Sequence, residues 1–96
     1  MKNKIQETLD ILQEECAEII VEISKCRRFG LHSKHYRTEI PHQEMLVNEI
    51  GDVLAMVDIL IDQGLVDEQT LNKAKQNKKE KLRIWSNIFN ENVDAN

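Results

Sequence analysis

The sequence predicts an all-α fold, a helical bundle that oligomerisation completes. Two long segments repeat apolar residues at intervals of three and four, as amphipathic helices do. Residues typical of helix starts and stops flank these segments and a third one, and no segment alternates as a strand would. The 96 residues include one Trp, one Tyr and two Phe, so Leu, Ile and Val must build the core. A single domain this small gains stability from association.

The first helix is expected from about Asn3 to Arg28. Gly30 is a plausible stop, because glycine is common just after a helix end and basic residues precede it near the negative end of the helix dipole. One apolar stripe, in alternating steps of four and three, runs along this segment and comprises Ile5, Leu9, Leu12, Cys16, Ile19, Ile23 and Cys26.

Residues 31–40 show no clear period and are expected to form a loop. His32, His35 and Tyr36 lie in it, and His42 follows shortly after. Histidines in such a segment are commonly polar surface residues. Tyr36 is a better candidate than Trp85 for stacking on a base, because Trp85 is in helical register with packing positions.

The second helix is expected to begin at Pro41, to continue to about Gln63 and to end at Gly64. Its stripe comprises Leu46, Ile50, Val53, Val57, Leu60 and Ile61, and further apolar residues lie off that stripe, namely Met45, Val47, Met56 and Ile59. A helix that is apolar nearly all round needs partners on more than one side. Some of those partners are expected from another subunit.

Asp67 is the expected N-cap of a third helix that runs from about Glu68 to near Phe89. Its packing positions are Leu71, Ala74, Leu82, Trp85 and Phe89. We therefore expect one all-α domain over residues 1–90 and a flexible C-terminal tail over residues 91–96.

The formal net charge of −4 argues against a general nucleic-acid binder. The charge is uneven, however, because six basic residues crowd the third helix: Lys73, Lys75, Lys78, Lys79, Lys81 and Arg83. A cationic strip together with an acidic cleft suits a metal-bound polyphosphate. The alternative is a solvated basic helix face.

The sequence indicates neither a secretory signal nor a membrane span. The first seven residues are polar with no apolar segment after them, and the longest apolar stretch, from Leu54 to Ile61, is short and interrupted by Asp58. Cys16 and Cys26 lie about 15 Å apart along one helix, too far for a disulfide. They are expected to be buried thiols in a reducing cytoplasm, so we predict a cytoplasmic protein with no membrane partner.

Two short acidic motifs are the most informative features of the chain. Glu15-Cys16-Ala17-Glu18 and Glu49-Ile50-Gly51-Asp52 each place two carboxylates three residues apart, which brings them together on one helix face. Four carboxylates that converge between two helices repel one another unless cations lie among them. Mg²⁺ accepts such oxygen ligands and usually shares them with substrate phosphates.

Helix geometry separates the glutamates of the first motif. At about 100° per residue, Glu14 lies nearly opposite the apolar stripe and is expected in solvent, whereas Glu15 and Glu18 border the core, with Glu22 as a flanking candidate. On the second helix Glu49 flanks the stripe, and Asp52 lies farther round. For one helix alone, surface glutamates are the better interpretation; the repeated spacing on the second helix favours a site.

The motif Glu14-Glu15-x-x-Glu18 followed by Glu49-x-x-Asp52 resembles that of the MazG-like all-α nucleoside triphosphate pyrophosphohydrolases. The similarity extends through residues 24–30, where the Arg-Phe-Gly ending resembles compact phage and bacterial versions of the family, and through residues 48–54 into the Lys-rich third helix. It covers residues 5–85. The interval of 30 residues between Glu18 and Glu49 is slightly long for the family.

The resemblance implies that Glu15, Glu18, Glu49 and Asp52 coordinate Mg²⁺ or Mn²⁺. It also implies hydrolysis of a (deoxy)nucleoside triphosphate, with dGTP or dATP as candidate substrates, to the monophosphate and pyrophosphate in control of the nucleotide pool. The expected assembly is a homo-oligomer, either a dimer or a tetramer built as a dimer of dimers.

Mechanistically, Glu18 or Glu22 is the candidate acceptor of the proton from an attacking water. The candidates for neutralising phosphate charge are Lys25, Arg28, Lys75, Lys78 and Lys79. Two alternatives stay open: a phosphoribosyl-ATP pyrophosphohydrolase, which shares the fold, and a non-catalytic helical adaptor whose apolar second helix serves only for assembly.

Overall fold

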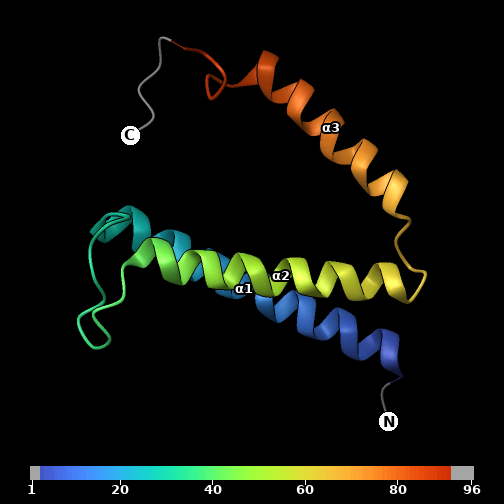
Figure 1. Ribbon diagram of the computed structural model, residues 1–96, viewed down its shortest axis with the longest axis horizontal. Coiled ribbons are helices and arrows are strands. Elements are labelled where there is room, and N and C mark those ends of the chain that lie inside the picture. The colour runs from blue at the N-terminus through green and yellow to red at the C-terminus, as the bar shows by residue number, and fades with distance from the viewer. Residues whose placement is uncertain (1–2, 92–96) are drawn as a thin grey trace. The chain divides into compact units, whose positions relative to one another are not determined.

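The computed structural model describes residues 3–91, which form three α-helices with no strand among them (Figure 1). Helix α1 spans Lys4–Phe29, α2 spans His42–Asp62 and α3 spans Glu68–Trp85. The predicted all-α class is confirmed for this part of the chain. By its contacts the chain divides into two units, residues 1–65 with α1 and α2, and residues 66–96 with α3. Of the predicted tail, residues 92–96 lie outside the described part.

Helices α1 and α2 form an antiparallel hairpin (Figure 1). At its open end, Gln63 Nε2 donates a 2.8 Å hydrogen bond to Thr8 Oγ1 and so ties the end of α2 to the start of α1. Asn3 caps α1 in a capping box with Gln6. Beyond α2, Gly64 has φ +76°, and the amides of Gly64 and Leu65 donate to the carbonyls of Ile61 and Leu60, the hydrogen-bond pattern of a Schellman motif.

The side of α1 that packs against α2, which we call its packing face, differs from the predicted apolar stripe. Counting 100° per residue, its centre is rotated by about 50° around the helix axis from the centre of that stripe. Its buried or half-buried members recur in steps of four and three, and they are Thr8, Leu12, Glu15, Ile19, Glu22 and Cys26. The facing residues of α2 are His42, Met45, Glu49, Val53, Met56 and Leu60. The contact between the helices therefore includes carboxylates as well as apolar side chains. Cys26 is buried as expected, but the prediction for Cys16 was wrong, since its thiol is exposed.

A second set of apolar residues remains exposed along both helices, and we call it the open apolar face. It consists of Ile5, Leu9, Cys16, Ile20 and Ile23 of α1 with Val47, Ile50 and Leu54 of α2. On both helices these residues are rotated in the same sense, by roughly 60–150° from the packing face at 100° per residue. In an antiparallel pair, rotation in the same sense leads to the same side. Ile20 is 68% and Leu54 58% exposed.

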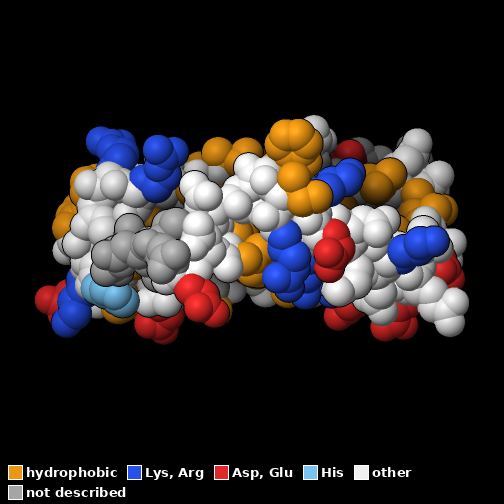
Figure 2. All heavy atoms as spheres, turned by 90° about the horizontal axis from the view of Figure 1, so that it is seen from above, with side chains coloured by type: hydrophobic (Ala, Val, Ile, Leu, Met, Phe, Trp, Pro, Cys, Tyr) orange, Lys and Arg blue, Asp and Glu red, His pale blue; other side chains and the backbone are white. Residues whose placement is uncertain are grey.

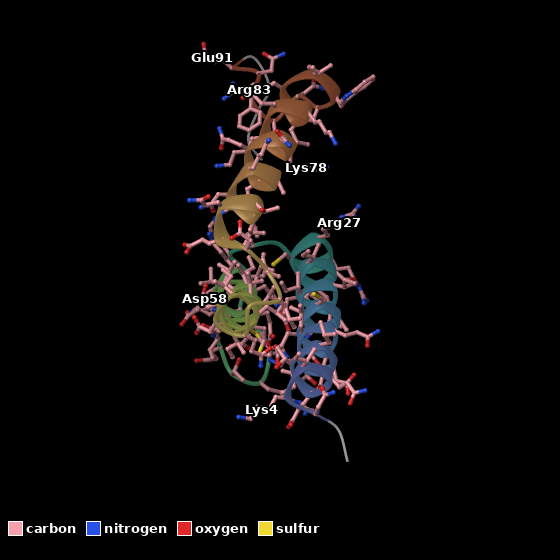
Figure 3. All side chains as sticks on the ribbon, turned by 90° about the vertical axis from the view of Figure 1, so that its right-hand side faces the viewer. Lys4, Arg27, Asp58, Lys78, Arg83 and Glu91 are labelled. Carbon is pink, nitrogen blue, oxygen red and sulfur yellow. The ribbon has the colours of Figure 1, made fainter. Side chains whose placement is uncertain are left out.

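Among the carboxylates of the two motifs, Glu18 and Asp52 are rotated in the opposite sense, by about 60–80°, whereas Glu15 and Glu49 lie within about 20° of the centres of the packing faces. We call the side of the hairpin that carries these carboxylates the acidic face. Asp58 belongs to neither set, and its side chain lies on the side of α2 away from α1 (Figure 3). None of the helices within residues 3–91 has the length and apolar character that crossing a bilayer requires.

Helix α3 begins where predicted and ends four residues earlier than predicted. Asp67 accepts a hydrogen bond from the amide of Thr70, which fixes the start. At the other end, Ser86 has extended backbone and its hydroxyl donates to the carbonyl of Leu82 at 2.7 Å, so the helix stops at Trp85. No residue of α3 is buried, and Trp85 is 82% exposed, so the predicted packing of Trp85 is absent from the described chain. Hydrophobic side chains stand on the surface among Lys and Arg (Figure 2).

Candidate metal centre

Three carboxylates from the two facing helices converge in the hairpin. Glu15, Glu49 and Asp52 each offer one oxygen atom, and these atoms all lie within 4.8 Å of one another. Glu15 and Glu49 are half-buried on the packing faces of α1 and α2, and Asp52 is exposed one turn along α2. The three-residue spacing of Glu49 and Asp52 brings both to the turn of α1 that carries Glu15.

The electrostatics of this cluster are those of a site short of positive charge. Burial raises the pKa of Glu15 above its ordinary 4.5, and the charges of Asp52 and Glu49, a hydrogen bond with Glu49 and the charge of Glu14 raise it further. Glu49 Oε2 is buried and has no hydrogen-bond partner among the described residues. A buried carboxylate oxygen without a donor is costly unless something outside the chain satisfies it.

The donor set fits a hard divalent cation. It consists only of carboxylate oxygens, which suit Mg²⁺ and Mn²⁺ better than the softer metals that prefer thiolate or imidazole. A cation would also give Glu49 Oε2 a partner and remove the repulsion that raises the pKa of Glu15. These observations support an acidic group able to hold a metal ion.

The other predicted glutamates differ in their surroundings. Glu14 is exposed, as helix geometry predicted. Glu18 is also exposed and is not one of the three clustered carboxylates. At 100° per residue it lies about 80° from the centre of the packing face of α1, whereas Glu15 lies about 20° from that centre. Glu22 is 5% exposed, and its Oε1 lies 3.4 Å from Lys25 Nζ, while its Oε2 is buried with no hydrogen-bond partner in the described chain.

The predicted cationic residues fall into two groups. Lys25 is half-buried and paired with Glu22, and Arg28 is exposed with its guanidinium 5.2 Å from the centre of the Phe29 ring. Lys75, Lys78 and Lys79 are exposed on α3, where Figure 3 labels Lys78. The first group therefore belongs to the same unit as the carboxylates, and the second group belongs to the other unit.

The sequence pattern missed a pocket of about 400 Å³ beside the loop that joins α1 to α2. Its lining comprises Lys25, Phe29, Ser33, Lys34, His35, Tyr36 and His42. The expectation that the histidines are surface residues was wrong for His42, which is 4% exposed and whose ring stacks on Phe29 with centroids 5.5 Å apart. A signal was available in the sequence: five residues with an aromatic or imidazole ring, the three histidines among them, lie between positions 29 and 42 of a chain that has few other aromatic residues.

Comparison of this chain with protein-family models, with curated proteins and with solved structures finds no match.

Proposed function

We propose that this protein is a metal-dependent nucleoside triphosphate pyrophosphohydrolase of the MazG-like all-α type, which converts a (deoxy)nucleoside triphosphate to the monophosphate and pyrophosphate. The observation that carries the proposal is the convergence of Glu15, Glu49 and Asp52 from two helices. These are three of the four positions that the family resemblance implies as metal ligands. If these residues formed only a charged helix surface with no metal site, there would be no reason for a half-buried glutamate to face two further carboxylates.

In this proposal Glu15, Glu49 and Asp52 hold Mg²⁺ or Mn²⁺. Such an ion, when bound, neutralises phosphate charge and lowers the pKa of a coordinated water. The remaining chemistry falls to side chains near the cluster. Glu18 lies one turn beyond Glu15 and is exposed to solvent, so it can complete the ligand set or accept a proton.

Glu22 suits a different role from Glu18. Its carboxylate is buried two turns beyond Glu15, and Lys25 holds one of its oxygens. The second oxygen has no hydrogen-bond partner among the residues that the structure describes, so it can accept a proton or a hydrogen bond. Lys25 and Arg28 are the cations of this unit that can offset phosphate charge, with Lys75, Lys78 and Lys79 of α3 as further candidates.

We also infer that the protein acts as a homo-oligomer, a dimer or a dimer of dimers, in which a second copy covers the open apolar face. Cys26 and Leu60 are the only buried hydrophobic residues in the described chain, which is a small core for a folded hairpin. A neighbouring hairpin seated on the open apolar face would bury Ile20, Ile23 and Leu54 in a four-helix arrangement.

The test is release of pyrophosphate from each ribo- and deoxyribonucleoside triphosphate and from phosphoribosyl-ATP, with and without Mg²⁺. Wild type is expected to release pyrophosphate only with the metal, and the substrate preferred separates the two enzyme alternatives. Glu49→Ala is expected to lower the activity by more than about 100-fold. Loss of a residue that only supports a metal ligand typically lowers activity by about 10- to 100-fold, so a larger decrease indicates a ligand. The oligomeric state of Glu49→Ala should stay that of wild type.

Absence of release from every triphosphate, by a wild-type protein that is folded and oligomeric, would leave only the adaptor function. Asp58→Ala is the matched control, since this acidic residue of α2 lies away from α1 (Figure 3) and should keep full activity.

A further inference from the structure

The pocket beside the α1–α2 loop has walls made largely of flat rings. His35 and Tyr36 stack with centroids 4.9 Å apart and ring planes 23° apart. Phe29 and His42 form a second stacked pair at 5.5 Å and 24°. His35 meets His42 edge-on, at 6.0 Å and 67°, so the two pairs adjoin. Flat walls of this kind favour flat ligands, because stacked and edge-to-face contacts add to the burial of apolar area.

One residue of the lining carries a buried polar atom that the described chain leaves without a partner. His42 lines the pocket, is 4% exposed, and has an Nδ1 atom that is buried with no hydrogen-bond partner among the described residues. An imidazole nitrogen donates or accepts according to its tautomer. A buried polar atom without a partner is costly, so this nitrogen indicates a ligand with a complementary group.

Backbone hydrogen bonds hold the loop that carries these rings in a defined shape. The amides of His42 and Gln43 donate to the carbonyls of Ser33 and Leu31, each at 2.9 Å, and the amide of His35 donates to Ile40 at 2.8 Å. Gly30 leaves α1 with φ +96° and ψ 148°, a region that only glycine adopts without strain. The hydroxyl of Ser33, another residue of the pocket lining, donates to the carbonyl of Phe29.

We propose that this pocket binds a nucleobase. The flat rings of Tyr36, His35, Phe29 and His42 would contact the faces and edges of the base, and His42 Nδ1 would form a hydrogen bond with a polar atom of its edge. A volume of about 400 Å³ lies in the range of small-molecule sites. The identification of the flat ligand as a base rests on the proposed function.

The position of the pocket along α1 suits one extended nucleotide. Lys25 lines the pocket, and its Nζ is held at Glu22, which lies seven residues from Glu15. Seven residues are two helical turns, or about 10 Å along the axis. Lys25 thus stands between the base pocket and the acidic cluster, where sugar and phosphate would pass.

The experiment measures binding of the four free deoxynucleosides, without metal and without phosphate, by NMR on the full chain. At least one nucleoside should bind wild type and shift the ring protons of Tyr36, His35 and His42. Tyr36→Ala should weaken that binding about tenfold, within the range measured for the loss of a base-stacking side chain. Tyr36→Phe should restore it, because the ring remains. Trp85→Ala removes an equally exposed aromatic residue of α3 and should change nothing.

The results separate this inference from the proposed function. If pyrophosphate release requires Mg²⁺ but no nucleoside shifts the rings of the pocket, the pocket inference fails and the enzyme stands. If a nucleoside binds as expected and no triphosphate is hydrolysed, the enzyme fails and the pocket stands as a base-binding site. If a nucleoside shifts residues of α3 and leaves the pocket unchanged, or if Tyr36→Ala binds as wild type does, the base lies elsewhere.

Discussion

The two faces of the α1–α2 hairpin are incomplete in opposite ways. On the acidic face, Glu15, Glu49 and Asp52 bring three carboxylate oxygens within 4.8 Å of one another, and Glu49 Oε2 is buried with no hydrogen-bond partner within residues 3–91. On the open apolar face, aliphatic side chains such as Ile20 and Leu54 are more than half exposed. The acidic face needs positive charge, and the apolar face needs more apolar surface.

The same helical geometry produces both faces. The packing face takes up the middle of each helix surface, and residues rotated to either side of it fall on one face or the other. Adjacent residues such as Glu49 and Ile50 therefore serve different faces. This separation allows the proposed metal site and the proposed assembly surface to be changed independently, and the following predictions test that independence.

The largest effect is expected on the open apolar face. Ile20→Lys places a charge where we infer that a second copy packs, so the dissociation constant of the oligomer should rise by about 100-fold or more, as at an interface hot spot. Light scattering after size-exclusion chromatography would show the lower mass.

The control for this change is the neighbouring residue. Val21 is also an exposed aliphatic residue of α1, but it points away from the open apolar face, so Val21→Lys should keep the mass of wild type. A wild-type protein that is already monomeric at high concentration would contradict the inferred assembly, as would equal effects of the two lysines.

A smaller effect is expected on the acidic face. Mg²⁺ at about 100 times its dissociation constant should raise the melting temperature of wild type by roughly 10 °C or more, because it binds only the folded cluster. Glu15→Gln should melt higher than wild type without metal, since it removes one repelling charge, and should lose the Mg²⁺ shift.

Glu14→Gln is the matched variant, because this adjacent glutamate is exposed and outside the cluster. It should keep most of the Mg²⁺ shift. Thermal scans by circular dichroism measure both quantities, and a Mg²⁺ shift that survives in Glu15→Gln would exclude Glu15 as a ligand.

Sequence reasoning reached the helices and most of the cluster because both depend on local spacing. The start of α3 at Glu68 follows from Asp67 as a cap, and the pairing of Glu49 with Asp52 follows from the helical repeat. The early end of α3 was missed because it depends on one serine hydroxyl that bonds back to Leu82.

The burial of Glu22 and the pocket could not be read from spacing. Both depend on which surfaces meet in three dimensions. The apolar stripe of α1 is broad, and the match to α2 selects a contact that includes Glu15 and Glu22 and leaves Glu18 outside. The burial of His42 depends on its stacking against Phe29 across the loop, a contact between residues 13 positions apart.

The smallest expected effect is on the pKa values of single carboxyl groups. Asp67, which lies outside the acidic face, is the reference with which Glu15 is compared. Hydrogen bonds from the amide and hydroxyl of Thr70 lower the pKa of Asp67 below 3.8, whereas burial and neighbouring carboxylates raise the pKa of Glu15 above 4.5. A carboxyl group with a lowered pKa stabilises the fold above its unfolded pKa, and this stabilisation is lost as the pH falls through the folded value. A raised pKa has the opposite sign: it destabilises the fold as the pH rises from the unfolded value through the folded one.

Carbon-13 NMR of the side-chain carboxyl groups in the metal-free protein should therefore give a titration midpoint below 3.8 for Asp67 and one above 4.5 for Glu15. Asp67→Asn keeps a capping oxygen without the charge, so it should leave the midpoint of Glu15 unchanged and slightly lower the helix content of α3 at neutral pH. Glu49→Gln should lower the midpoint of Glu15 and leave that of Asp67 unchanged, because Glu15 lies beside the Glu49 carboxylate and Asp67 does not. A Glu15 midpoint at or below 4.5 would mean that the three carboxylates do not converge in solution, and the acidic face would then be an ordinary charged helix surface.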